Sequence, residues 1–255
     1  MEMEYFNKQE SFKKIIHTVH AYLIESPSEQ DNSAAARELS MMLLCADERN
    51  SPCGFCLDCK KIKGNHHPDV TEIDVEDKKS ISVESIRDFK RDFYYQPNEG
   101  RYRIYLIDGA QNMTVQAQNS LLKILEEPPL YVRFVLTTTQ KQRILPTILS
   151  RLFSVYLPPE ATGSLLEKLQ ARFPEKAQSE LQSFVSVSGG YFKRAVALSL
   201  KEESKRRQND VAQLFLLACK RQKGEYFDFG TKIINKDKLS SHARNFLFFT
   251  LFTSL

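Results

Sequence analysis

The sequence predicts an α/β protein built on a parallel β-sheet with helices on both faces. Strand-like and helix-like segments alternate up to Pro158 and Pro159, and such alternation is typical of parallel sheets. Two strand segments, "RYRIYLID" (101–108) and "VRFVLTTT" (132–139), contain nearly continuous apolar runs, as strands buried on both faces do. Both observations favour a sheet enclosed between two layers of helices.

The first strand and its flanking helices follow from the spacing of apolar residues. Residues 12–22 place apolar side chains at helical intervals and then pass into the short strand "AYLI" (21–24). A polar loop follows. From Ser33 the run "SAAARELSMMLLC" is rich in helix formers, and its cap is expected in the stretch from Asp31 to Ser33.

The later elements of the sheet domain have clear boundaries. Alternation in "DVTEIDVE" (69–76) predicts a strand, and "SVESIRDFKRDFYYQP" (82–97) reads as an amphipathic helix. The segment "TVQAQNSLLKILEEPP" predicts a helix capped near Thr114 and stopped by its two prolines. A short helix and a last strand are expected in "ILPTILSRLFSVYLPP" (144–159).

Changes in pattern divide the chain into three predicted domains. Residues 1–159 form the sheet domain, with a cysteine-rich module at 45–66, and residues 160–202 form a small helical domain. Residues 203–255 form a third, helical domain, which is expected to be partial. Its last residues, "NFLFFTLFTSL", give an apolar helix face that is either an interface or the sign of a truncated chain.

Composition excludes several classes of protein. The 255 residues are 42% hydrophobic and 27% charged, as in an ordinary globular protein. The net charge of +4 is too small to establish nucleic-acid binding. Because no apolar stretch has the length of a signal peptide core or a membrane span, we expect a cytoplasmic protein.

Four of the five cysteines predict a metal site. Cys45, Cys53, Cys56 and Cys59 are spaced C-x7-C-x2-C-x2-C, and four thiolates can close a tetrahedral shell around Zn²⁺. Such a shell leaves no position for water, so the zinc would be structural. The alternative is four reduced cysteines without a metal. The histidines at 66 and 67 could replace a ligand, although four cysteines suffice and other roles are expected for both.

Several motifs together resemble the clamp-loader family of AAA+ proteins, from bacterial DNA polymerase III. They are "RIYLIDGAQNMTVQAQNSLLKILEEPP", "FVLTTT" and "ILPTILSRLFSVYLPP", and the stretches "LLKILEEPP" and "ILPTILSR" are the most specific. The resemblance covers about residues 12–200. It implies that the sheet domain is a RecA-like AAA+ domain with a zinc insertion, residues 160–202 its lid, and residues 203–255 part of a collar domain.

The loop at the nucleotide position of that family lacks the residues that bind phosphate. A working loop, G-x-x-x-x-G-K-[ST], uses glycines for close backbone approach and a lysine for charge. Here Ser26 and Asp31 stand in place of the glycines, Asn32 in place of the lysine, and Ser33 at the hydroxyl position. Asp31 opposes phosphate binding by its charge. Relieved of that task, the loop from Ser26 to Ser33 is expected to be free to vary.

The second ATPase element is also incomplete. Asp108 ends the "YLID" strand, where the family holds magnesium, but Gly109 follows it in place of the glutamate that activates water. Asp108 is therefore read as a helix or loop cap. The threonines at 137–139 and Arg194 occupy sensor positions, and structural roles are expected for them. We therefore expect this chain neither to bind ATP as a cofactor nor to hydrolyse it.

The resemblance implies one residue that acts outside the chain. In the family, an arginine at the place of Arg151, after Ser150, projects into the ATP site of an adjacent subunit. Leu152 stands here where the family has cysteine, which leaves the charge in place but makes the role less secure. The alternative is an arginine in a surface salt bridge after a helix. The preceding "EEPP" (126–129) is a helix stop that in the family also faces a neighbour or DNA.

These observations lead to three hypotheses. The first is a non-catalytic subunit of the DNA polymerase III clamp loader, which helps load the sliding clamp onto primed DNA in replication and supplies Arg151 to a neighbour. Its expected partners are the tau/gamma motor subunits and the delta subunit, with the clamp and DNA reached through the complex. The second is an ATP-hydrolysing motor subunit of the tau/gamma type. The third is a free-standing zinc-dependent nucleic-acid-binding module.

Overall fold

A computed structural model describes residue 6 and residues 15–73, 80–84, 86 and 95–201. Nearly all of them lie in the first of two compact units, Met1–Val196 and Ala197–Leu255. The predicted domain boundaries at 159 and 202 stay predictions. Among the described residues, no helix combines the length and apolar character that crossing a membrane requires.

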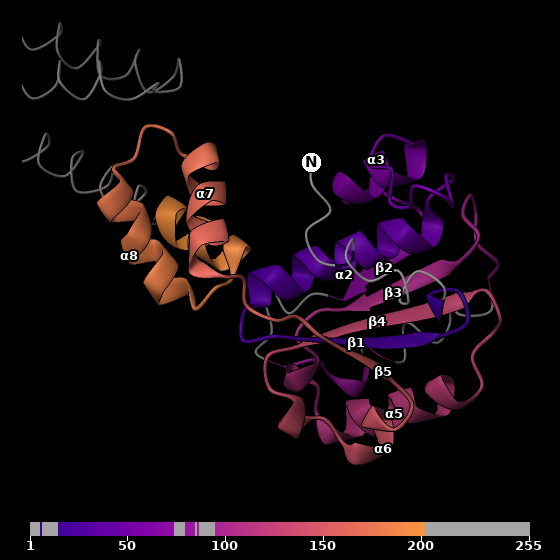
Figure 1. Cartoon of the computed structure of the whole chain (residues 1–255). Helices are drawn as coiled ribbons and strands as arrows, with labels where there is room; N and C mark the ends of the chain where they lie inside the picture. The colour runs from indigo at the N-terminus through magenta and orange to yellow at the C-terminus, as the bar shows by residue number, and fades with distance from the viewer. Residues whose placement is uncertain (1–5, 7–14, 74–79, 85, 87–94, 202–255) are drawn as a thin grey trace, which may run out of the picture. The chain divides into compact units, whose positions relative to one another are not determined.

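The core of the fold is a five-stranded parallel sheet in the order β2-β3-β4-β1-β5 (Figure 1). This confirms the predicted parallel sheet. The strands and helices of the sheet domain are β1 (Ala21–Glu25), α2 (Glu29–Leu44), α3 (Leu57–Lys63), β2 (Val70–Ile73), β3 (Arg103–Ile107), α5 (Val115–Glu126), β4 (Val132–Thr138), α6 (Pro146–Leu149) and β5 (Phe153–Tyr156), with 3-10 turns η1 (Ala110–Asn112) and η2 (Lys141–Arg143).

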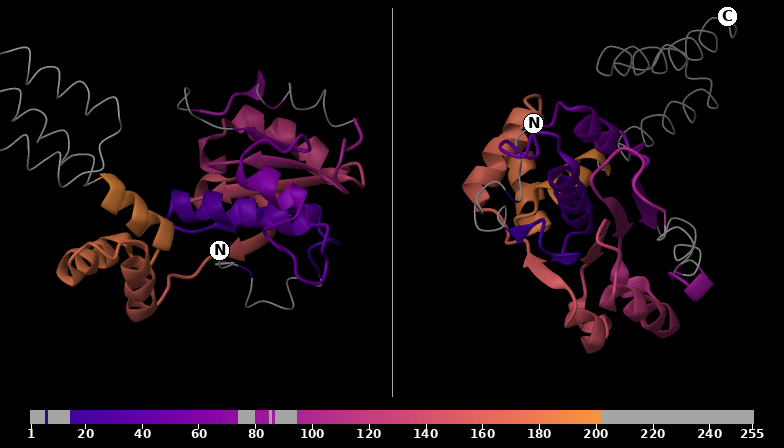
Figure 2. Two further views of the ribbon diagram at one scale, coloured as in Figure 1. Left: turned by 90° about the horizontal axis from the view of Figure 1, so that it is seen from above. Right: turned by 90° about the vertical axis from the view of Figure 1, so that its right-hand side faces the viewer.

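Helices cover both faces of the sheet, and the alternation of side chains along β1 shows why. Leu23 packs into one buried cluster, to which α5 and α6 contribute, while Tyr22 and Ile24 pack into a second cluster with residues of α2. All three side chains have no exposed surface. In Figure 1 and in the right panel of Figure 2 the sheet lies between α2 and the pair α5 and α6.

The start of α2 corrects the sequence prediction. The helix begins at Glu29, and Ser28 is its cap, because the Ser28 hydroxyl accepts a hydrogen bond from the Asp31 N–H at 3.2 Å. The stretch from Asp31 to Ser33 therefore lies inside the helix, in its first turns. By contrast, the predicted cap of α5 is confirmed: the Thr114 hydroxyl accepts a hydrogen bond from the Ala117 N–H.

Other expected elements are described only in part. The strand predicted at 69–76 is β2, Val70–Ile73, and the residues after it lie outside the described ones. Of the helix predicted at 82–97, the described residues include only both ends. The helical domain predicted at 203–255, with its apolar final helix, lies outside the described residues.

A small helical unit follows the sheet domain. It contains α7 (Thr162–Arg172), α8 (Gln178–Ser188) and the start of a helix at residue 192, which pack around a buried apolar cluster. Gly189 (φ +67°) ends α8 in the left-handed conformation. At Gly190 a Cβ atom would lie only 2.6 Å from the Pro159 side chain, so this position requires glycine.

Candidate functional site

The loop between β1 and α2 is closed by its own side chains. The Ser26 hydroxyl donates a hydrogen bond to the Ser28 carbonyl and accepts one from the Ser28 N–H, both at 3.1 Å. Ser26, Ser28, Asp31 and Asn32 are each only 1% exposed. The expectation that this loop is free to vary stays a prediction, and the burial of these four side chains argues against it, because a buried polar group needs a hydrogen-bond partner that most replacements would lose.

Asn32, at the position of the phosphate-binding lysine, holds two strands together. Its Nδ2 donates hydrogen bonds to the carbonyl oxygens of Ser26, at 3.1 Å, and Thr138, at 2.9 Å. These carbonyls lie at the ends of β1 and β4, which are neighbours in the sheet. A neutral amide thus bonds the protein's own backbone at the point where a working loop has a cation for phosphate.

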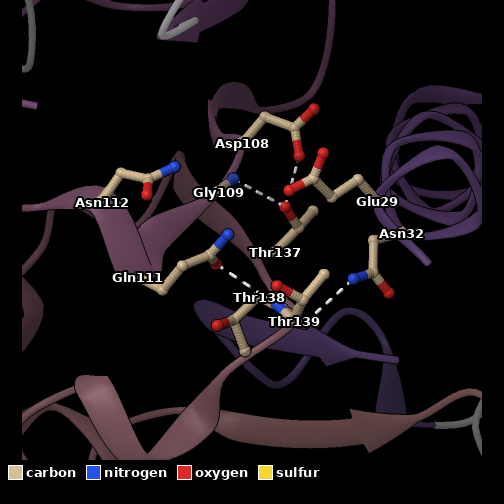
Figure 3. A pocket seen from close by; sticks show the side chains of 9 residues that line it. All are labelled: Glu29, Asn32, Asp108, Gly109, Gln111, Asn112, Thr137, Thr138 and Thr139. Carbon is tan, nitrogen blue, oxygen red and sulfur yellow. Dashed lines mark hydrogen bonds between the residues drawn. The ribbon is translucent and has the colours of Figure 1, made fainter. Parts of the chain in front are cut away.

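Asp108 is occupied in a similar way by hydroxyl groups of the chain. One carboxylate oxygen accepts a hydrogen bond from Ser33 Oγ. The other accepts one from Thr137 Oγ1, which in turn accepts one from the Gly109 N–H at 2.9 Å (Figure 3). Gly109 has φ +70°, a left-handed conformation that favours glycine and starts η1. The side chains that would share a magnesium ion in a working ATPase are therefore bonded directly to each other.

A small polar pocket remains beside these residues. It has a volume of about 120 Å³ and is lined by Glu29, Asn32, Asp108, Gly109, Gln111, Asn112, Thr137, Thr138 and Thr139 (Figure 3). Small-molecule sites usually measure roughly 300 to 1,000 Å³. No lysine or arginine is among these lining residues, so the pocket offers neither the volume nor the positive charge that a nucleoside triphosphate needs.

The threonines at the end of β4 are bonded within this region. Thr138 Oγ1 accepts a hydrogen bond from the Gln140 N–H at 3.1 Å, and the Thr139 N–H donates one to Gln111 Oε1 at 3.3 Å. Arg194, the other sensor position, reaches the loop through its backbone: its N–H donates a hydrogen bond to Asp31 at 3.1 Å. These groups thus have structural partners inside the chain.

Arg151 lies at the surface, just beyond the C-terminal end of α6. Its Nη1 donates a hydrogen bond to the Thr147 carbonyl at 2.7 Å, and its Nη2 forms an ion pair with Glu126 at 2.6 Å. The Arg151 side chain is 34% exposed, whereas Leu152 is buried in the core. The surface salt bridge expected as the alternative is therefore present in the single chain. Ser150, which is exposed, ends the same helix.

Glu126 is the partner that the sequence did not reveal. It is the last residue of α5 and the first of the "EEPP" stretch, which was read as a helix stop. The available signal was a carboxylate at a helix end that two prolines follow, but Glu126 and Arg151 are 25 positions apart in the sequence, which hid the pair.

The four predicted cysteines meet in one cluster. The Sγ atoms of Cys45, Cys53, Cys56 and Cys59 all lie within 4.8 Å of one another. Backbone N–H groups of the three later cysteines donate hydrogen bonds of 3.3 to 3.4 Å to the sulfur of the preceding cysteine. With Zn–S bonds of about 2.3 Å, a tetrahedral site places sulfurs roughly 3.8 Å apart. The donor set and its spacing therefore fit a tetrahedral metal ion.

The local environment differs among the thiols. Burial raises the pKa of Cys59 and of Cys45, so both resist ionisation without a metal. Burial acts in the same direction on Cys53, but backbone N–H groups of Phe55 and Cys56 outweigh it and lower the pKa of Cys53 to about 7. Of these three thiols, Cys53 ionises most readily, and a thiolate is the form that binds a metal.

The histidines that follow the cysteines are not part of the cluster. The His67 side chain is buried, its Nδ1 accepts a hydrogen bond from the Asp69 N–H at 3.1 Å, and its Nε2 therefore carries the proton facing Asp58 at 3.3 Å. His66 is exposed. His67 thus connects α3, which carries Asp58, to the start of β2.

Asp69 fixes the same region from the other side. Its carboxylate accepts hydrogen bonds from the backbone N–H groups of Asn98, Glu99 and Gly100 at 2.6 to 2.8 Å. Burial raises the pKa of Asp69, but these three donors outweigh burial and hold the pKa below its usual range. The charged carboxylate therefore stabilises the turn that leads into β3.

The fold and the site define a class of protein. A parallel sheet of this order, with a loop that leads from β1 into α2 and an acidic residue, Asp108, directly after β3, is the framework of a P-loop ATPase of the AAA+ type. A family model described as "DNA polymerase III, delta subunit" matches residues 4–161. The chain belongs to this family.

The chain is similar to several proteins named as subunits of DNA polymerase III. The chain is 30% identical to DNA polymerase III subunit delta' of Bacillus subtilis, over 82% of this chain and 62% of that protein. It is 32% identical to subunit gamma/tau of Mycobacterium tuberculosis, over 59% of this chain and 27% of the relative, and 37% identical to subunit tau of Escherichia coli, over 54% and 21%. The chain thus spans about a quarter of the length of these gamma/tau relatives.

Solved structures give lower similarity. A gamma subunit-related protein of DNA polymerase III from Thermotoga maritima is 22% identical, with a TM-score of 0.46 over 96% of this chain and 77% of that one. RuvB of Thermotoga maritima is 14% identical, with a TM-score of 0.46 over 76% and 61%.

Proposed function

We propose that this chain is a non-hydrolysing, delta prime-type subunit of the DNA polymerase III clamp loader. The observation that carries the proposal is the closed loop, in which Asn32 and Asp108 bond groups of the chain where a motor subunit would hold nucleotide and magnesium. The subunit works in the cytoplasm beside tau/gamma motor subunits and the delta subunit. It contacts the sliding clamp and primed DNA through the complex, and its role is in DNA replication.

In this proposal Arg151 is supplied to the ATP site of a neighbouring motor subunit. Its support is the exposure of the side chain and the weakness of its present bonds. A surface ion pair such as Arg151–Glu126 contributes only about 0 to 1 kcal/mol, so exchanging Glu126 for the charge of a γ-phosphate costs little. An arginine provided in this way stabilises the charge of the phosphoryl-transfer transition state.

The cysteine module is proposed to hold one structural Zn²⁺. Four sulfur donors leave no open coordination position, so the ion would fix the chain between Cys45 and Cys59 and take no part in a reaction. The helical unit from residue 160 is proposed as the lid, and residues 203–255 as part of a collar domain.

The decisive experiment uses the complete reconstituted clamp loader with clamp and primed DNA. We expect Arg151→Ala to lower the rate of clamp loading at least tenfold, since arginine fingers contribute roughly 10³-fold or more to catalysis. Total ATPase should fall less, because only one ATP site borders this chain. Arg172→Ala removes an exposed arginine of α7 and serves as the control. Unchanged clamp loading with Arg151→Ala would falsify the assignment.

The motor alternative makes the opposite prediction. A tau/gamma-type subunit needs a cation at the position of Asn32, and the chain has an amide there that is bonded to two carbonyls. Calorimetric titration of the purified chain with ATP separates the two functions. We expect no binding heat, and tight binding with turnover would favour the motor.

A further inference from the structure

Asp31 lies between the first turn of α2 and the start of the helix at residue 192. One carboxylate oxygen accepts a hydrogen bond from the Lys193 N–H at 3.2 Å, and the other accepts bonds from the Arg194 N–H at 3.1 Å and the Ser28 hydroxyl at 2.6 Å. The residue is 1% exposed. More than 160 residues of chain separate the two sides of this contact.

The amides that face Asp31 are those that a helix leaves unpaired. The first N–H groups of a helix have no partner within it and carry partial positive charge, which makes a helix start a favourable place for an anion. The helix from residue 192 begins after Gly190 and Tyr191. Neither residue has the side-chain oxygen of a Ser, Thr, Asp or Asn cap, so the segment that precedes the helix provides no such cap. Asp31 provides the missing acceptor from the sheet domain.

Two neighbouring contacts hold the same segment in place. The Glu160 N–H donates a hydrogen bond to the Gly190 carbonyl at 2.8 Å, and the Tyr191 hydroxyl donates one to the Leu157 carbonyl at 3.3 Å. The tight approach of Gly190 to Pro159 adds a steric constraint. The segment 190–194 is thus fixed to the sheet domain through several independent bonds, and Asp31 contributes the only charged group among those named here.

We propose that Asp31 is a built-in anion that fastens the lid helix to the nucleotide loop. A phosphate bound at this loop would also bring negative charge near this helix start, so the chain carries in a side chain a charge that an anionic ligand could supply. That comparison with a ligand rests on the proposed absence of ATP, whereas the fastening itself does not. The consequence is a lid position that the chain sets by itself, whether or not nucleotide is present.

Amide hydrogen exchange on the purified full chain tests this contact. We expect Asp31→Ala to raise the exchange rates of the Lys193 and Arg194 amides about tenfold or more, since local opening then exposes them. Asp31→Asn, which keeps the shape and one acceptor, should give an intermediate increase and guards against a variant that fails to fold. Glu29→Gln is the matched control, because it removes an acidic charge from the same helix turn at an exposed residue.

The amides inside α7 and α8 provide an internal reference. They should keep their rates in all variants, and ATP should leave the wild-type rates unchanged. Unchanged rates at Lys193 and Arg194 in Asp31→Ala would overturn the proposal. So would an equal increase across α7, α8 and the sheet, which would mean that Asp31 serves general stability. The clamp-loading assay of Arg151→Ala does not depend on this contact, so the two proposals can fail separately.

Discussion

The nucleotide loop and the cysteine module both bring together side chains of the kinds that bind ligands. They differ in what these side chains bond to. In the loop, Asn32, Asp108 and Asp31 are bonded to other groups of the chain. In the module, three of the four sulfurs accept a hydrogen bond from the N–H of the next cysteine, and all four share the geometry of a metal site. The comparison teaches that ligand-type side chains can bond to groups of the same chain in one region, whereas four thiols gathered in another present their sulfurs at distances that fit a metal ion.

The largest expected effect is the loss of thermal stability when the metal is removed. Structural zinc binds zinc-finger peptides with about 10 to 16 kcal/mol, and if the module retains even about 3 kcal/mol of that as stability, chelation lowers Tm by roughly 6 to 12 °C. Scanning calorimetry with and without a chelator, alongside elemental analysis, measures this. Cys53→Ser should lower Tm similarly and abolish the response to chelator.

Cys219→Ser is the control for the loss of a thiol, since this cysteine is not one of the four in the module. If the chain purifies without metal, and its Tm is the same with and without chelator, the module does not need a metal. The contrast between the two regions would then disappear. Both would then be completed by the protein alone.

A smaller effect is expected at Asn32. Asn32→Ala removes the amide donor from the Ser26 carbonyl, while the Thr138 carbonyl keeps the Ser26 N–H at 3.3 Å, and a buried group that loses its partner costs about 1 to 3 kcal/mol. We therefore expect about 2 kcal/mol less stability in urea unfolding. Gln30→Ala, at an exposed neighbour in α2, should change stability by less than about 0.5 kcal/mol.

Asn32→Lys probes the same comparison more sharply. It restores the residue of a working loop, but the new charge is buried and the carboxylates of Asp31 and Asp108 remain. We expect lower stability and no ATP binding by calorimetry. Gain of ATP binding in this variant would mean that the loop can still open around phosphate. The side-chain hydrogen bonds that close the loop would then contribute little free energy.

Much of the fold was predictable from local patterns. Apolar runs in β3 and β4 indicated strands buried on both faces, and the spacing of the cysteines indicated one cluster, because both depend on residues close in sequence. The start of α2 was misplaced since Ser28 and Asp31 are both good caps. Only the fold decides between them, by burying Asp31 against another helix start.

The partners of the site residues were out of reach for a different reason. Asp31 contacts Lys193 and Arg194, which lie near the far end of the described chain. Glu126, the last residue of α5, contacts Arg151, which follows α6. Side-chain types alone cannot select such pairs, because many carboxylates and many donors are available. The sequence therefore showed what the nucleotide loop had lost but not what had replaced it.

The smallest expected effect concerns the Arg151–Glu126 pair, which belongs to neither kind of region. We expect a coupling free energy of at most about 1 kcal/mol from a double-mutant cycle of Arg151→Ala and Glu126→Ala in urea unfolding, because both side chains reach solvent. The coupling should shrink further at high salt, which screens exposed charges.

This small value matters for the proposed role. An arginine that serves a neighbour must leave its own ion pair, and each 1.4 kcal/mol of coupling lowers the population of the released side chain tenfold. A coupling of 2 kcal/mol or more would reduce that population roughly thirtyfold and make Arg151 a structural residue, completed within the chain like those of the nucleotide loop. A coupling near zero keeps Arg151 available, as the cysteines are, for a partner from outside.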